Sequence, residues 1–206
     1  MTAIAKRISY LTHARRGKPI TSAKKHIKYV EANRMKKDGE PVHRNIPSLF
    51  NSEQNKIDRK DIYKILDNQP KQGVVMHKFV FSISEDERNR GQINLEELVR
   101  ESMERYQTTL NRQFTWFAAV HDDKGHPHAH VLILGRDKER KEVGLFKGHL
   151  KKLNQIVEKS RERQEERNLD RGLIRNEFDL LRELDAEREL SLTQEKINTN
   201  EREMSR

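Results

Sequence analysis

The chain has 206 residues and a mass of 24.5 kDa, enough for one sizeable domain with an appendage. Cysteine is absent, which excludes disulfide bonds, thiolate zinc sites and a cysteine nucleophile. The net charge is +9, no apolar run is long enough to cross a membrane and no signal peptide opens the chain, so we expect a cytoplasmic protein with an anionic partner and no membrane association.

The positive charge is concentrated at the start of the chain. Residues 1–50 contain twelve Lys and Arg residues against three acidic ones, so this quarter carries the entire excess and residues 51–206 are neutral. Such clustering favours the neutralisation of phosphates on a nucleic-acid partner over a general solubility charge. A disordered basic arm is the alternative interpretation.

The first elements are an edge strand and two helices. Apolar residues at helical spacing predict a helix over 20–34, capped by Thr21 or Ser22, and a shorter helix over 58–67. An edge strand is expected before the first helix. A β-rich run then predicts a strand over 74–83.

The second half of the chain adds a helix, two strands and a long helical segment. An amphipathic helix is predicted over 95–110, followed by β-type runs over 114–120 and 128–134 that a short polar turn separates. From residue 146 the pattern is helical to about residue 190, with a possible break at Gly172.

This order of elements predicts an α+β fold, with an antiparallel sheet and helices on one face. We expect residues 1–165 to form one domain and residues 166–206 to form a charged helical tail, because large apolar residues are sparse in the tail.

Four of the nine histidines fall within ten residues, between His121 and His130. His128 and His130 are two apart on a predicted strand, so both imidazoles lie on the same face. A hairpin register that opposes His121 to His128 or His130 brings three imidazoles together. Three neutral imidazoles leave coordination positions open around a divalent ion such as Zn, Mn or Ni, which is typical of a catalytic metal site. His126, in the turn, is a weaker fourth candidate.

One tyrosine differs from the other three. Tyr29 lies about 180° from Ile20 around the first helix, on the polar side. Its phenol, with a pKa near 10, becomes a nucleophile when a base or a metal-polarised electrophile activates it. Tyr10, on the edge strand, is the second choice, whereas Tyr63 and Tyr106 are expected to pack helices.

Two segments carry a resemblance to a known family. Residues 121–130, His-Asp-Asp-Lys-Gly-His-Pro-His-Ala-His, resemble the metal motif H-x-D-x-x-x-P-H-x-H of the HUH endonucleases, specifically the conjugative and mobilisation relaxases of the Mob/Vir type. Residues 22–31 resemble their N-terminal motif, in which a helix carries the nucleophilic tyrosine, here Tyr29. Phe81-Ser82-Ile83 matches their third motif, a serine after a strand, only loosely. Relaxases place the tyrosine before the histidines, and no tyrosine follows His130.

The resemblance implies a relaxase with an HUH-type palm. Tyr29 would nick one strand at the transfer origin of a plasmid or mobile element and form a 5′-phosphotyrosine link, which initiates conjugative transfer. The three histidines would hold Mn²⁺ or Mg²⁺, and Asp123 would orient a ligand histidine or deprotonate the phenol. Some mobilisation relaxases use a histidine nucleophile, so His26 and His13 stay alternatives. The implied partners are single-stranded origin DNA, accessory relaxosome proteins and coupling proteins.

The basic residues expected to hold flanking phosphates are Arg15, Arg16, Lys18, Lys24, Lys25, Lys28 and Arg34. Asp122 or Asp123 is expected to accept a hydrogen bond from a second ring nitrogen of a ligand histidine.

Other classes of protein fit some of these features. An HUH-type replication initiator or transposase would usually place the tyrosine downstream. A metal-dependent hydrolase would use an activated water and form no covalent link to DNA. A basic DNA-binding module with a structural metal would account for the charge but not for a tyrosine on the polar side of its helix.

Overall fold

The computed structural model describes residues 4–13, 17–32, 48–123 and 126–204. The chain divides into two compact units, Met1–Glu165 and Glu166–Arg206. Among the described helices, none is both long and apolar enough to cross a membrane.

In chain order the elements are β1 (Ile4–Thr12), α1 (Pro19–Glu31), α2 (Arg59–Asp67), β2 (Val74–Ser82), α3 (Glu85–Gly91), α4 (Leu95–Leu110), β3 (Phe114–Asp123), β4 (His126–Asp137) and α5 (Lys147–Met204).

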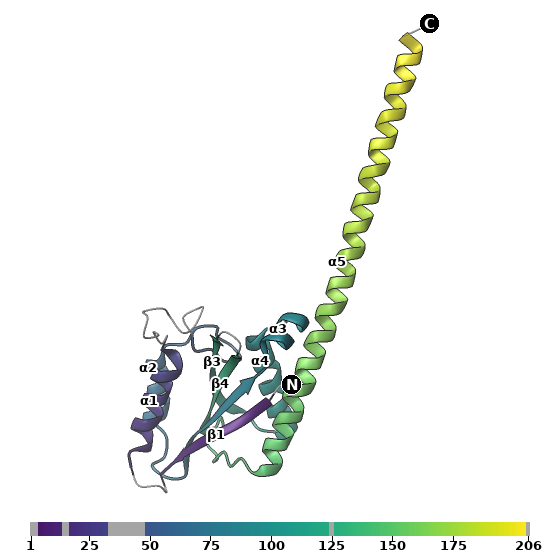
Figure 1. Cartoon of the computed structure of the whole chain (residues 1–206). Coiled ribbons are helices and arrows are strands. Elements are labelled where there is room, and N and C mark those ends of the chain that lie inside the picture. Colours follow the sequence, from purple (N-terminus) through teal and green to yellow (C-terminus); the bar gives the residue numbers. More distant parts are fainter. Residues whose placement is uncertain (1–3, 14–16, 33–47, 124–125, 205–206) are drawn as a thin grey trace. The chain divides into compact units, whose positions relative to one another are not determined.

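The four described strands form one antiparallel sheet in the order β1-β2-β4-β3 (Figure 1). Strands β3 and β4 form a hairpin whose register pairs His121 with His128. On its outer edge β3 is met by a short bridge between Phe50 and Ala118. The predicted hairpin register is therefore confirmed.

Both faces of the sheet are covered by helices, with α1 and α2 on one side and α3 and α4 on the other (Figure 1). The core on the α4 side includes Phe79 and Ile133, and the core on the α1 side includes Met76 and Leu132. The α+β class with an antiparallel sheet is confirmed, but helices cover two faces instead of the one expected. The reason is that β4 carries large apolar side chains on both faces, Val131 and Ile133 on one and Leu132 and Leu134 on the other.

Several element boundaries agree with the sequence pattern. Helix α4 coincides with the predicted helix over 95–110, and α2 begins directly after Asp58, whose side chain accepts a hydrogen bond from the backbone N–H of Lys60. The hairpin strands run longer than predicted, because polar residues at their ends continue the pairing to Asp123 and Asp137.

Two local predictions were wrong, and one short helix was missed. Helix α1 begins at Pro19, ahead of the predicted caps, because a proline in the first turn has its φ preset for a helix. Gly172 lies inside α5 and does not break it, since one glycine costs a helix only about 1 kcal/mol. The seven residues of α3 were not predicted at all, and a capping box between Ser84 and Glu87 starts this polar helix.

Gly135 lets β2 and β4 approach closely. A Cβ at this position would lie 1.7 Å from the backbone oxygen of Val74. We therefore expect Gly135→Ala to lower the free energy of unfolding by about 3 kcal/mol, measured by urea or thermal denaturation. Gly148→Ala is the matched control, because a Cβ there meets nothing within 4 Å and its expected effect is below about 0.5 kcal/mol. Equal stability of the two variants would contradict the close approach.

Candidate metal-centred active site

Three histidines converge at the end of the β3–β4 hairpin where β3 ends and β4 begins. One ring nitrogen from each of His121, His128 and His130 lies within 4.8 Å of the others. The ring centroids are 5.2 Å apart for His121 and His128, 4.8 Å for His121 and His130, and 5.1 Å for His128 and His130. His121 and His130 are buried and His128 is half-buried. Three imidazole donors on one side of a point fit a divalent ion with open coordination positions.

Helix α1 holds one of these rings. The Nε2 atom of His121 lies 2.7 Å from the backbone oxygen of Val30. Since a carbonyl oxygen only accepts hydrogen bonds, Nε2 carries the proton and donates it, which leaves Nδ1 as the donor atom for a metal. For His121 this support comes from the end of the tyrosine-bearing helix, whereas the predicted support from Asp122 or Asp123 stays a prediction, because those side chains lie outside the described residues.

Tyr29 lies beside the cluster. Its ring centroid is 6.2 Å from that of His130, in an edge-on arrangement, and the tyrosine is 39% exposed. Ala23, Ile27 and Val30 are fully buried on the opposite side of α1 and fix the rotation of the helix. Tyr29 thus points away from the buried stripe of α1, and its ring lies beside His130 of the cluster.

His26 shares this site. Its ring is stacked on Tyr29 at 5.8 Å between centroids and 15° between planes, and it lies 6.2 Å from His130. Burial, and to a smaller extent the nearby charge of Lys78, lower the pKa of His26 to about 4, so this imidazole is neutral at pH 7. Its Nε2 atom is buried and has no hydrogen-bond partner among the described residues.

The other described tyrosines lie elsewhere. Tyr10 pairs with His77 on β2, and both belong to the sheet face of Phe79, opposite the histidine cluster. Tyr63 donates a hydrogen bond to the backbone oxygen of Lys24, and Tyr106 is fully buried in the core. The sheet thus separates the second-choice nucleophile from the histidines.

His13 also lies away from the cluster. It follows β1 at Thr12, where β1 pairs with Val74, whereas the histidines lie beyond the other end of β2, near Ser82. His13 and the histidine cluster thus lie at opposite ends of β2.

Some predicted site residues fall outside the described part of the chain. These are Arg15, Arg16 and Arg34, and the side chains of Asp122, Asp123 and His126. The backbone of Asp123 pairs with that of His126 at the end of the hairpin.

The described lysines of α1 divide into two groups. Lys18, Lys25 and Lys28 are exposed. Lys24 forms an ion pair with Asp67 of α2, 2.6 Å from a carboxylate oxygen, so part of its charge serves to hold the two helices together. Lys24 is thus the half-buried and paired member of the predicted phosphate-binding set, and Lys18, Lys25 and Lys28 are its exposed members.

Two further polar residues on β2 share the face of the cluster. Ser82 pairs directly with His128, so both side chains lie on the same side of the sheet. Lys78 lies on that face four residues earlier, and its pKa is lowered by burial. Sequence reasoning gave Ser82 little weight and missed Lys78, although a lone lysine within the apolar run Val74–Ser82 was a visible signal.

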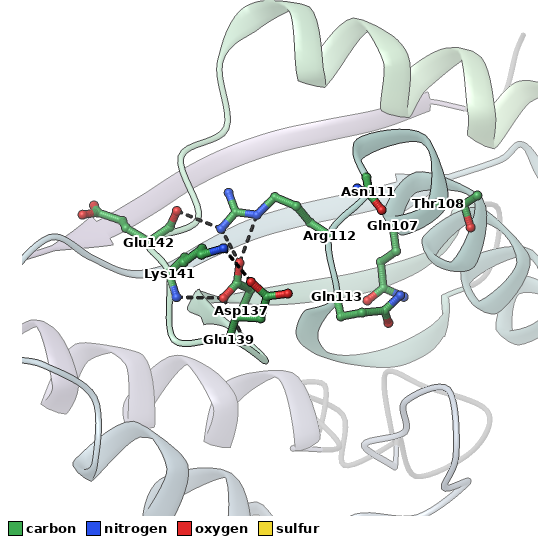
Figure 2. Close-up of a pocket in the computed structure, with 9 residues that line it drawn as sticks. All are labelled: Gln107, Thr108, Asn111, Arg112, Gln113, Asp137, Glu139, Lys141 and Glu142. Atoms are coloured by element: carbon green, nitrogen blue, oxygen red, sulfur yellow. Dashed lines mark hydrogen bonds and ion pairs between the residues drawn. The ribbon is translucent and has the colours of Figure 1, made fainter.

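A polar cavity of about 650 Å³ lies at the opposite end of the hairpin from the histidines (Figure 2). Its charged groups are paired with one another, since Arg112 Nε lies 3.0 Å from a carboxylate oxygen of Asp137. Burial alone would raise the pKa of Asp137, but the hydrogen bonds from Arg112 and from the backbone N–H groups of Lys141 and Glu139 outweigh it and lower the pKa. The cavity therefore lies at the turn that follows β4, which these hydrogen bonds hold in place. It is not part of the histidine site.

Comparisons with known proteins found a family match and a similar solved structure. Residues 29–169 match the family described as relaxase, MobA/VirD2-like, nuclease domain. The chain is also similar to a solved structure described as the molecular basis of vancomycin resistance transfer in Staphylococcus aureus, at 15% identity and a TM-score of 0.50, over 82% of this chain and 94% of that chain. At this identity the likeness concerns the fold alone. No curated protein matches the chain.

Proposed function

The chain belongs to the MobA/VirD2-like family of relaxase nuclease domains, and from this premise we propose that it nicks one strand of DNA at a transfer origin through Tyr29. The observation that carries the proposal is the position of the Tyr29 ring, 6.2 Å from His130 within a three-histidine cluster. Tyr29 is the described tyrosine that lies on this face next to the histidines, and it is exposed enough to meet a DNA strand.

The proposed step is an exchange of two ester bonds at one phosphorus. The phenol oxygen of Tyr29 forms a bond to phosphorus while the bond from phosphorus to the 3′-oxygen breaks. The products are a 5′-phosphotyrosine link and a free 3′-hydroxyl. The proton that the phenol loses is matched by the proton that the 3′-oxygen gains, so the step is balanced and its reversal reseals the strand without an external energy source.

The residues of the site divide the work of this step. His121, His128 and His130 would hold the metal, and Mn²⁺ or Mg²⁺ bound there would neutralise charge on the non-bridging phosphate oxygens. The carbonyl of Val30 fixes the orientation of His121. We assign Asp123 the role of orienting a ligand histidine or taking the phenol proton, on the motif alone.

Substrate binding would use the basic residues near Tyr29. Lys25 and Lys28 are exposed on the same helix, and Lys18 precedes its first turn. We propose that they hold phosphates of single-stranded origin DNA, together with Arg15, Arg16 and Arg34. In conjugation the partners would be accessory relaxosome and coupling proteins, and the reaction would take place in the cytoplasm.

The direct test is the capture of the covalent product. The chain is incubated with single-stranded DNA of the transfer origin and Mn²⁺, and the protein is then digested and analysed by mass spectrometry. We expect nucleotides attached to the peptide that contains Tyr29, together with an adduct that survives denaturing electrophoresis.

Two other outcomes separate the rival functions. Cleavage without any adduct would indicate a metal-dependent nuclease that uses water. Binding without cleavage under every divalent metal tried would indicate a DNA-binding module, and either result would overturn the proposal.

A further inference from the structure

Lys78 lies in the middle of β2, on the sheet face that carries the histidine cluster. It pairs with Ser9 of β1 and with Leu132 of β4, and its face is that of Val80, which pairs with His130. Lys78 and His130 are therefore diagonal neighbours on adjacent strands, about 7–8 Å apart between Cα atoms. The backbone register alone thus brings a lysine next to a proposed metal ligand.

The ammonium of Lys78 has no anionic partner among the described residues. The side chain is half-buried, and burial is the cause that lowers its pKa, with no carboxylate opposing the shift. By contrast Lys24, on the helix above, is paired with Asp67. A cation that is partly removed from water costs stability unless an anion approaches it, so a bound anion would stabilise the charge of Lys78.

The charge of Lys78 reaches the nucleophile side of the site. It contributes to lowering the pKa of His26, whose ring is stacked on Tyr29. Lys6 of β1 pairs with Val80, so it lies on the same face, and it is exposed. Lys6 and Lys78 thus place positive charge on the sheet face that α1 covers, between the edge strand β1 and the histidines.

We propose that Lys78 is a phosphate-binding residue of the nicking site, whose ammonium contacts a phosphodiester of the single strand beside His26 and Tyr29. This inference rests on the proposed function, because it assumes that the strand crosses this face. A phosphate supplies the missing counter-charge, and a lysine supplies a point charge that needs no fixed donor geometry. Lys78 thereby helps to place the scissile strand within reach of the phenol.

The test measures binding separately from cleavage. Fluorescence anisotropy records the affinity of the wild type, Lys78→Gln and Lys78→Arg for a labelled oligothymidylate, in excess chelator and over a series of salt concentrations. For Lys78→Gln we expect the affinity to fall about tenfold. The slope of log K against log salt should become shallower by about 0.7, the value for one single-strand phosphate contact. Lys78→Arg should keep the slope of the wild type.

Lys138→Gln is the matched control, because Lys138 follows β4 at its other end and pairs with Glu53. It should leave affinity and slope unchanged, and thermal melting of each variant establishes that it is folded. If Lys78→Gln keeps the salt slope of a wild type that binds and nicks DNA, the role of Lys78 is overturned and the proposed function stands. If the wild type binds no single-stranded DNA, both are overturned.

Discussion

Tyr29→Phe should slow the nicking of single-stranded origin DNA by a factor on the order of 10⁴ or more and abolish the covalent adduct. The substitution removes only the phenol oxygen, the atom that would attack phosphorus. The ring that lies against His26 and His130 stays, and Tyr29 is partly exposed, so the fold should be retained. Denaturing electrophoresis of the adduct and the rate of strand cleavage measure the two effects.

Tyr10→Phe is the control for this experiment. Tyr10 lies on the opposite face of the sheet beside His77, so its variant should nick at the rate of the wild type. Adduct formation by Tyr29→Phe at the wild-type rate would contradict the assignment of the nucleophile.

His26 is the residue to examine if Tyr29→Phe keeps its activity. Its ring is as near to His130 as that of Tyr29, and its lowered pKa keeps it neutral, as a nucleophile requires. Its Nε2 atom is buried, however, whereas Tyr29 is exposed. The chemistry of the adduct separates the two, because a phosphorus–nitrogen bond to imidazole is cleaved by acid and a phosphotyrosine ester is not.

The histidine cluster could be predicted because its geometry is local. Two strands joined by a short turn have few possible registers, and one that pairs His121 with His128 brings the third imidazole in automatically. The orientation of Tyr29 was equally local, because the apolar stripe of one helix determines which side faces water.

What the sequence did not show depends on contacts between distant segments. Val30 and His121 are 91 residues apart, and their hydrogen bond exists only because α1 packs on the sheet face that carries the histidines. The approach of Lys78 to His26 likewise joins β2 to α1. The periodicity of apolar residues within one helix or strand does not predict contacts of this kind, because they join residues of two distant elements.

The coverage of both sheet faces was missed for a related reason. An alternating strand suggests one wet face, but β4 carries Val131 and Ile133 on one face and Leu132 and Leu134 on the other. Continuous apolar runs of this kind indicate a strand buried on both sides. The run Val131–Leu134 therefore held the signal for a second layer of helices.

Replacing a proposed metal ligand should have the other large effect. We expect His130→Ala to weaken Mn²⁺ binding by at least about 100-fold and to reduce nicking to the level of the chelated wild type. The ring of His130 contacts those of both Tyr29 and His121. Its loss would therefore remove one metal ligand and the contact between the cluster and Tyr29. Titration calorimetry of Mn²⁺ in the absence of DNA gives the affinity independently of activity. His149→Ala is the control, because His149 lies beside Phe146, outside the cluster.

The same titrations distinguish a catalytic metal from a structural one. His121, His128 and His130 stand on two strands that are already paired by backbone hydrogen bonds and backed by buried residues on both faces. Removal of the metal from the wild type should therefore lower the melting temperature only by the amount that ligand binding contributes, while nicking is lost and returns with Mn²⁺ or Mg²⁺. Unfolding of the chain in chelator would instead mean that the imidazoles hold a structural ion. Unchanged Mn²⁺ affinity in His130→Ala would mean that the cluster is not the metal site, because two imidazoles cannot replace three without a loss of binding energy.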